Sequence, residues 1–377
     1  MPASPIATKP ATDSTVDASA ASSSSKDAAV SRTANPKTAR VFEKAYGILN
    51  IAGLGFLVPL IRMLRGESPR TQLKHLWRLA GVPVVAIVVF LLLWAQLSSS
   101  IVTSLGQIPG PKQVWEQTES LWKDHVLQRE KAVAFYERQA VRNAELLADD
   151  PAAEISTATY TGKPTYIDQI FTSLRTVFAG FILASVIAIP VGILCGLSAN
   201  INAAMNPFIQ IFKPVSPLAW LPIVTMLVSA LYVSPDPLFE KSFITSAIVV
   251  ALCSLWPTLI NTTLGVASID KDLLNVAKVL QLKWTTKLFK LVIPFSLPLI
   301  FTGLRLSLGV GWMVLIAAEM LAQNPGLGKF VWDEFQNGSS NSLGRLMVAV
   351  FTIGIIGFLL DRVMFTIQSM VSFNERR

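Results

Sequence analysis

The sequence predicts an all-α protein that crosses a membrane several times. Of its 377 residues, 52% are hydrophobic and only 15% are charged, and its mean hydropathy is +0.51. Soluble domains carry about 25% charged residues, so this chain is too poor in charge to be one of them. A helix needs about 20 apolar residues to cross the hydrocarbon core of a bilayer. Six apolar runs are long enough, at 82–104, 171–197, 207–233, 243–267, 296–321 and 345–371.

The N-terminal part of the chain divides into two segments. Residues 1–40 are mainly Ala, Ser, Thr and Pro with scattered charges, and such a segment cannot bury a core, so we expect a disordered tail. In the next segment, 41–80, the apolar run 47–64 is short and contains a proline near its end. We expect it to be an interfacial helix on the cytoplasmic side, leading into the first span at 81–105. The alternative, that 47–64 itself spans the membrane, stays open.

The positions of Lys and Arg predict which side of the membrane each loop faces. Cytoplasmic loops carry an excess of these residues, and they gather both just before the first span and within 268–295. The four runs between these two regions return the chain to the same side. Both termini are therefore expected in the cytoplasm, and the insertion 106–168, which has helical periodicity over 114–147, in the periplasm. We therefore expect the net charge of +8 to set the orientation of the protein in the membrane and not to bind nucleic acid.

A polar segment at 269–298 separates two apolar runs and is amphipathic. Between residues 273 and 282, apolar residues recur three to four positions apart, as in a short helix with one apolar face. Small Ala277 would let a partner approach closely, and Pro294 and Pro298 would then turn the chain back into the next span. A segment of this kind can receive force from a soluble partner, although an ordinary cytosolic loop helix fits the pattern as well.

The sequence lacks the patterns that would indicate enzymatic or metal chemistry. Its two cysteines, Cys195 and Cys253, lie in apolar runs, and its two histidines, His75 and His125, stand far from either of them. It contains neither HExxH nor GxxxxGK[ST], the phosphate-binding motif of many ATPases. We therefore expect no catalytic residue, no metal site and no cofactor in this chain, and no ATP hydrolysis by it.

Within the polar segment, one motif resembles that of the permease subunits of binding-protein-dependent ABC importers. The family pattern is Glu-Ala-Ala, a Gly four residues after the second Ala, and a distant Ile-Pro or Leu-Pro. The matching positions here are Asn275, Val276, Ala277, Gln281 and Pro294. The resemblance implies that these residues couple the subunit to its ATPase. Asn for the acidic residue, Val for the first Ala and Gln for Gly depart from the family pattern.

A second motif, KPVSPLAWLPI at 213–223, is similar to a signature of the nitrate, taurine and sulfonate permeases. The sequences at 303–305 and 317–320 match the same group. The branch for nitrate, nitrite, cyanate and bicarbonate fits best, also because of the sequence at 328–333. The resemblance covers about 165–372, and it implies the type I ABC importer permease fold, with a core at 169–372.

The resemblance implies the pore-forming subunit of an ATP-driven importer for a small inorganic anion, first of all nitrate or nitrite. It also implies a second permease subunit (in a homodimer or a heterodimer), two ATPase subunits that use ATP and Mg, and an extracytoplasmic solute-binding protein or domain. The assembly would sit in the lipid of the bacterial inner membrane and work by alternating access. Taurine, sulfonate, cyanate and bicarbonate are alternative substrates. An ion-coupled secondary transporter is the alternative from another class.

Four side chains in the apolar runs are candidates for the translocation pathway. Ser216 and Trp220 belong to the third run, where three prolines predict a broken helix that can line a cavity. Arg305 lies roughly 14 Å into the fifth run at 1.5 Å per residue, and it either contacts the anion or pairs with a carboxylate. Trp312 follows further along the same run and either lines the pathway or only packs.

Two further expectations concern helix packing and the outer mouth. Gly192 and Gly196 form a pair of small residues four apart, which is typical of close helix contact. Glu319 lies well beyond Arg305 in the same run and near the outer mouth. Since a carboxylate there would repel anions, we expect Glu319 to be a gate or a docking contact for the binding protein.

Overall fold

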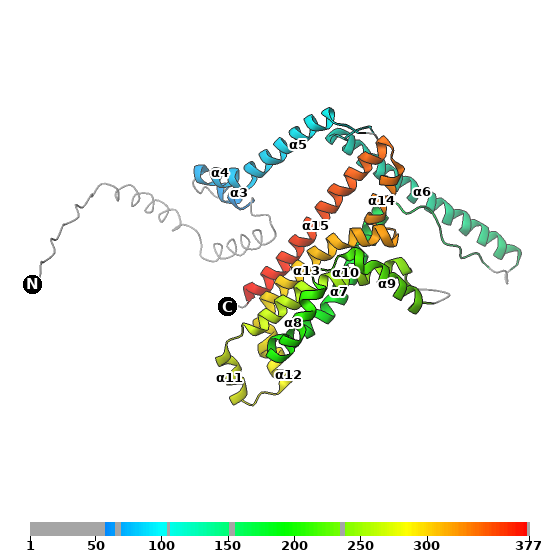
Figure 1. The fold of residues 1–377 in the computed structure, drawn as a ribbon. Helices are drawn as coiled ribbons and strands as arrows, with labels where there is room; N and C mark the ends of the chain where they lie inside the picture. The colour runs from blue at the N-terminus through cyan, green and yellow to red at the C-terminus, as the bar shows by residue number, and fades with distance from the viewer. Residues whose placement is uncertain (1–56, 65–68, 104–105, 151–154, 234–237, 375–377) are drawn as a thin grey trace, which may run out of the picture. The chain divides into compact units, whose positions relative to one another are not determined.

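The computed structural model is almost entirely helical in the residues it describes (Figure 1). Residues 1–40, and most of the run 47–64, lie outside those residues. The contacts divide the chain into two units, residues 1–86 and 87–377, which are treated separately below. The described residues are 57–64, 69–103, 106–150, 155–233 and 238–374.

The first unit contains two short helices and the start of the first span. Helix α3 covers Leu57–Leu64, and helix α4 covers Pro69–Leu76. A π-helical turn at Trp77–Gly81 leads into α5, Val82–Ser100, so that one helix long and apolar enough to cross a membrane runs from 71 to 100. The helix of the expected first span therefore ends at Ser100, before the end of the apolar run 82–104. Whether 47–64 lies at the interface stays a prediction.

The second unit holds the remaining helices and a small hairpin. In the hairpin, β1 (Val102–Thr103) pairs antiparallel with β2 (Gly106–Gln107). The helices are α6 Pro111–Asp149, α7 Tyr166–Leu197, α8 Ala199–Phe212, α9 Pro217–Leu231, α10 Lys241–Ala267, α11 Lys271–Val279, α12 Trp284–Lys287, α13 Ile293–Ala322, α14 Leu327–Asn337 and α15 Ser340–Asn374.

Helices α7 and α10 are packed in parallel through glycines. A Cβ atom at Gly180 would meet Val250, and one at Gly196 would meet Val266, so residue numbers rise together along the two helices. Gly192 makes an equally close contact between these two, as the spacing of Gly192 and Gly196 predicts. Glycine lets two helix backbones approach where any side chain would separate them. This confirms the expected close packing.

The parallel packing of α7 and α10 shows how α8 and α9 cross the membrane. Since both helices run in the same direction, the chain between them must return from one end of the bundle to the other. That return is made by α8 and α9, which meet at 101° across the break at 213–216. The pair is therefore one broken span, as the prolines predict, and not a re-entrant loop. With the five unbroken helices that are long and apolar enough, the described residues contain six spans.

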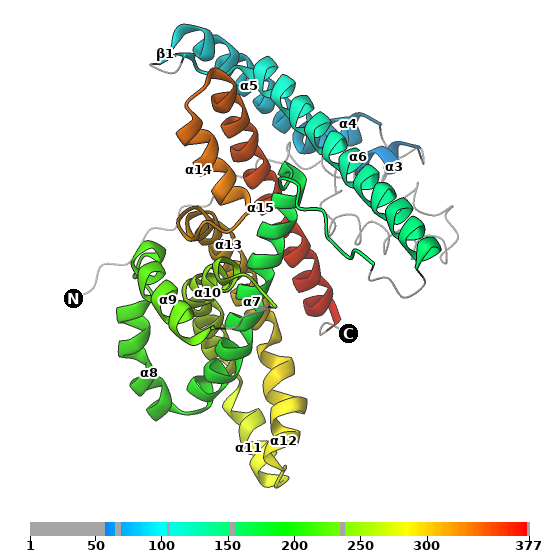
Figure 2. The same cartoon turned by 90° about the vertical axis from the view of Figure 1, so that its right-hand side faces the viewer.

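The other spans give the bundle two distinct ends (Figure 2). Helix α13 runs antiparallel to α10, because Gly265 faces Ser296 while Thr258 and Ser307 share a hydrogen bond of 2.7 Å. At one end, called the α11 end, lie α11, α12 and the C-termini of α7, α10 and α15. At the opposite end, called the α14 end, α6 packs against α14 and α15 through Leu121. The fold is thus an all-α polytopic membrane protein, as the composition predicts.

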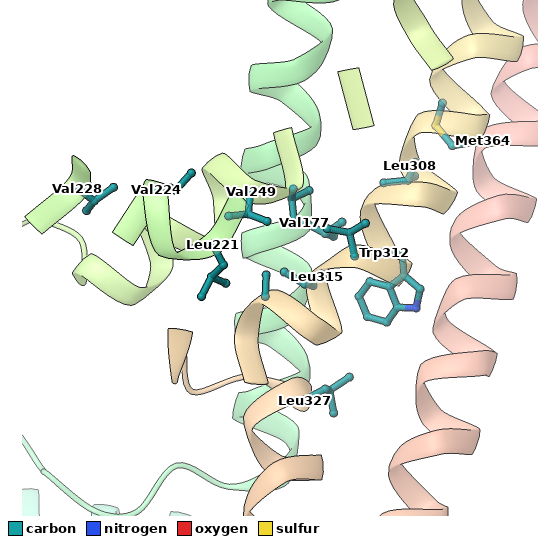
Figure 3. Close-up of a cluster of buried hydrophobic side chains, with 13 residues drawn as sticks. Val177, Leu221, Val224, Val228, Val249, Leu308, Trp312, Leu315, Leu327 and Met364 are labelled. Atoms are coloured by element: carbon teal, nitrogen blue, oxygen red, sulfur yellow. The ribbon is translucent and has the colours of Figure 1, made fainter. Parts of the chain in front are cut away.

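The main hydrophobic core lies where α7, α9, α10 and α13 meet (Figure 3). Val177, Val249 and Leu315 are fully buried there, and Leu221 anchors α9 to the same cluster. Leu327, at the start of α14, closes the core toward the α14 end. This core fixes the broken span against three unbroken ones, so the elbow between α8 and α9 has a defined position.

Candidate functional site

The polar segment folds into a helix that projects at the α11 end of the bundle. Helix α11 begins after Asp270, whose side chain caps it by accepting a hydrogen bond of 2.9 Å from the backbone N–H of Asp272. Asp272 in the first turn and Lys278 in the last turn both match the helix dipole. A nine-residue helix is marginal alone in water, so its packing on the bundle must hold it.

One face of α11 packs on the ends of the spans. Leu274 contacts a buried cluster formed by Ile193 of α7, Val266 of α10 and Val292 just before α13. Ala277 lies on the same inner face and is only 4% exposed. The side chain of Ala277 therefore packs within this chain, and its expected role in the close approach of a partner stays a prediction.

The opposite face of α11 is apolar and uncovered. The side chains of Val276, Val279 and Leu280 are 53%, 82% and 63% exposed, and they neighbour one another at helical spacing. Asn275 is exposed beside them, and lysines surround the patch. Three adjacent aliphatic side chains facing water at the tip of a membrane protein indicate a contact surface for another protein.

A left-handed residue ends α11 and turns the chain back. Gln281 has a φ of 48°. Its N–H donates to the carbonyl of Lys278 (3.0 Å), and the N–H of Leu282 donates to the carbonyl of Ala277 (3.1 Å). These two bonds form a Schellman motif, in which the left-handed position is usually glycine. Gln281 thus stands where the family pattern has Gly and takes the conformation that glycine adopts without steric cost.

The prolines do not make the turn that the sequence predicts. The helix is continuous from 284 to 322, and Pro294 lies within its course, directly after a π-helical turn at Leu288–Val292. A π-helical turn changes the hydrogen-bond register, so the helix can pass the position that lacks an N–H donor. The reversal of direction lies earlier, at Gln281. The predicted turn at Pro294 and Pro298 is therefore wrong.

Two of the four pathway candidates tie α13 to α15. The Nε and Nη2 atoms of Arg305 donate to the two carboxylate oxygens of Asp361 at 2.6 and 2.8 Å. The guanidinium also lies 5.1 Å from the ring centre of Phe365. Trp312 is buried, and its Nε1 donates to the carbonyl of Ile353 at 3.0 Å. Arg305 thus has a carboxylate partner and Trp312 is packed, while both also line a cavity of about 200 Å³, so their place in the pathway stays a prediction.

The other two candidates lie at the elbow of the broken span. Ser216 caps α9, and its hydroxyl accepts a hydrogen bond of 3.3 Å from the N–H of Leu218. Trp220 lies in the first turn of α9, with its ring centre 5.8 Å from that of Phe212. The Nε1 of Trp220 is shielded from solvent and has no hydrogen-bond partner among the described residues. Trp220 packs against the main hydrophobic cluster that also contains Trp312.

Glu319 of α13 is a buried carboxylate near the α14 end, and the sequence did not predict its burial. Glu319 is fully buried and accepts hydrogen bonds from Ser173 of α7 (2.7 Å), the N–H of Gly328 (3.1 Å) and Asn324 (3.3 Å). Of the two expected roles of Glu319, the docking contact with a binding protein is wrong, because the side chain is fully buried, and the gate stays a prediction. The signal in the sequence was the glycine at 326 and at 328, since a Cβ at either position would collide with Glu319.

Comparison with known proteins decides the family. A family model described as "Binding-protein-dependent transport system inner membrane component" matches residues 188–373. The nitrate import permease protein NrtB of Synechocystis is 34% identical over 295 residues, which cover 78% of this chain and 90% of that protein. The chain belongs to this family of transport permeases. The bicarbonate transport system permease protein CmpB of the same organism is 34% identical over 291 residues, covering 77% and 88%.

Among solved structures, the permease resembles an inward-facing form of the MetNI methionine ABC transporter. The TM-score is 0.46 and the sequence identity 14%, over 55% of this chain and 95% of the other. This likeness is too low to add to the family assignment, which the curated relatives carry. The matched range 188–373 includes both motifs, the one at 213–223 and the one within 269–298, and it does not include α6.

The turn at the end of α11 gives a prediction for the permease. Replacing Gln281 by Gly removes a left-handed strain of about 1 kcal/mol, so Gln281→Gly should raise the midpoint of thermal unfolding. Gln281→Val should lower it, because a β-branched residue tolerates positive φ poorly. Thermal unfolding of the purified permease in detergent measures both. A midpoint for Gln281→Gly below that of Gln281→Val would contradict the assigned turn.

The buried carboxylate of the permease gives a second prediction. Glu319→Ala leaves three donors, from Ser173, Asn324 and Gly328, without their acceptor inside the protein, which should cost about 3 kcal/mol or more. Glu319→Gln keeps one oxygen acceptor and should cost less. The midpoint of thermal unfolding should therefore be highest for the wild type, lower for Glu319→Gln and lowest for Glu319→Ala. An Ala variant as stable as the wild type would show that the network contributes nothing.

Proposed function

We propose that this permease is the pore-forming subunit of an ATP-driven importer for a small inorganic anion. Nitrate or nitrite is the first choice and bicarbonate the second. The observation that carries the proposal is the similarity to relatives named for nitrate and bicarbonate over about nine-tenths of their length. Nitrate and bicarbonate are both monovalent, planar oxyanions of similar size, so one pathway chemistry suits both.

In this proposal, ATPase subunits dock at the α11 end and use ATP and Mg there. The ATPase would contact the exposed apolar face of Val276, Val279 and Leu280. Leu274 on the inner face would transmit the movement of α11 to the spans against which it packs. Leu274 rests on the ends of α7 and α10 and on the start of α13. Displacing α11 would therefore move three spans as one rigid body, as alternating access requires. Gln281 keeps the helix at a fixed angle to the helix that follows.

The same proposal assigns the two ends of the bundle to the two sides of the membrane. The lysines around α11 favour a cytoplasmic position for the α11 end, and the C-terminus would lie on the same side. The α14 end, with α6, would then face the periplasm and receive the extracytoplasmic binding protein. A second permease subunit would complete the pore, most simply as a homodimer, in the inner membrane.

ATP-dependent uptake of labelled anion into proteoliposomes tests the function. The permease would be reconstituted with its ATPase subunits and binding protein, and labelled nitrate and bicarbonate compared at equal concentration. We expect uptake that requires ATP and does not depend on an ion gradient. Uptake without ATP, driven by a gradient across the vesicle, would instead support a secondary transporter.

A further inference from the structure

The elbow of the broken span lies near the middle of the membrane. The ring of Phe212, the last residue of α8, stacks on Trp256 of α10 at 8°, with 6.4 Å between ring centres. Trp256 stands close to the middle of α10, which runs from Lys241 to Ala267. At 1.5 Å per residue, the helix continues for about 16 Å beyond Trp256 to its end at Ala267. The residue after Phe212, which is Lys213, is therefore deep within the span.

Lys213 differs from the other cations at this depth. Arg305 is neutralised by Asp361, and Arg362 lies next to that carboxylate and over the ring of Phe358, 5.1 Å from its centre. Lys213 is exposed, and no carboxylate of the described residues lies within ion-pair distance of it. A charged side chain inside the membrane is costly unless it meets a counter-charge or a water-filled path. The interface is too far for its four methylene groups to reach.

The groups around Lys213 suit an oxyanion. Ser216, three residues further along at the same elbow, is exposed, whereas the Nε1 of Trp220 is buried and has no hydrogen-bond partner among the described residues. The first N–H groups of α9 add little charge, because those of Leu218 and Ala219 already donate to Ser216. The positive charge at the elbow thus comes from the lysine. An exposed ammonium group with the hydroxyl-bearing Ser216 on the same elbow is suited to bind a monovalent oxyanion.

We propose that Lys213 is the cation that contacts the anion halfway along its path, with Ser216 beside it. This inference rests on the proposed function, since it names a substrate contact within that pathway. It also assigns different roles to the charged residues of the spans. Arg305 holds α13 to α15 through Asp361, whereas Lys213 meets the substrate. The contact must be brief, so a single lysine serves better than a tight guanidinium pair.

The test compares Lys213→Gln with Lys213→Arg in the fully assembled importer. The number of anions taken up per ATP hydrolysed is measured in proteoliposomes at saturating, loaded binding protein. We expect Lys213→Gln to lower this ratio at least tenfold, while Lys213→Arg keeps more than half of it. Arg362→Gln is the matched control, because it removes a charge at a similar depth, and it should keep the wild-type ratio. A purely structural role for Lys213 would change assembly and not the ratio.

The outcomes separate this inference from the function on which it rests. An unchanged ratio in Lys213→Gln, with anion uptake by the wild type intact, overturns the role of Lys213 alone. An equal loss in Arg362→Gln overturns it as well, since any charge within the spans would then have the same effect. If the wild-type complex takes up no anion, the proposed function fails, and the inference fails with it. Should Lys213→Gln not assemble, the ratio in Lys213→Arg decides, and a loss in that variant counts against a charge contact.

Discussion

The variant Val279→Glu, which places a charge on the outer face of α11, is expected to lose its bound ATPase during purification. Val279 is 82% exposed at the tip of the molecule, so the permease itself should fold normally. At the proposed interface, the carboxylate would be buried without a partner. Disruption at the centre of an interface costs about 2 kcal/mol or more, which weakens binding by roughly 30-fold. Co-purification of the ATPase with tagged permease measures the loss.

Two variants of neighbouring residues sharpen this prediction. Lys278→Gln also changes an exposed side chain of α11 and should leave ATPase binding close to that of the wild type. Ala277→Glu should act differently, because Ala277 is buried against the bundle, and a charge there disturbs the permease before any partner binds. Its thermal unfolding midpoint should fall, whereas that of Val279→Glu should not. Normal ATPase recovery with Val279→Glu would rule out this face as the contact.

The second large effect is expected at the contact between α7 and α10. A Cβ at Gly192 would lie 2.7 Å from the Cβ of Thr262 and 2.9 Å from the carbonyl oxygen of Leu259. Gly192→Leu would therefore force two spans apart, against backbone that cannot move aside. Overpacking a tight core usually costs about 1–3 kcal/mol, and a backbone contact places this variant at the upper end or beyond. The yield of folded permease from membranes should drop steeply.

Gly354→Leu is the matched control for this variant. Gly354 also lies within a span, but a Cβ there would have no neighbour within 4 Å among the described residues. The same change in side-chain volume should therefore leave the yield and the unfolding midpoint of the single permease chain nearly unchanged. Equal losses from both variants would mean that leucine is harmful at any glycine of the spans, and the close packing would no longer explain the result.

The architecture could be predicted well because few physical rules determine it. Apolar runs of sufficient length mark each span, and the prolines around 213–216 mark the break between α8 and α9. Gly192 and Gly196 could be read as a close contact, since spacing alone places them on one face. Their partner helix, and the parallel packing that makes 198–240 a crossing segment, depend on contacts distant in sequence, which one sequence does not reveal.

The roles of single residues were harder to predict, for reasons visible in the structure. Helix α11 carries aliphatic residues on both faces, so periodicity could not tell that Ala277 faces inward while Val279 faces outward. Position along the run placed Glu319 near the outer mouth, but it could not show that donors from Ser173, Asn324 and Gly328 surround the carboxylate. Lys213 was part of a recognised motif but was overlooked as a charge, since its depth depends on the stacking of Phe212 on Trp256.

The claim that a partner ATPase drives this permease through the α11 end is tested most directly by site-specific photo-cross-linking. A photoreactive amino acid would replace Val279 on α11 or, in a separate variant, Trp122 on α6 near the α14 end, both of which are exposed. In the assembled complex, we expect position 279 to cross-link to the ATPase and position 122 not to do so. Cross-linking of the ATPase from position 122, or none from position 279 in an intact complex, would contradict the claim.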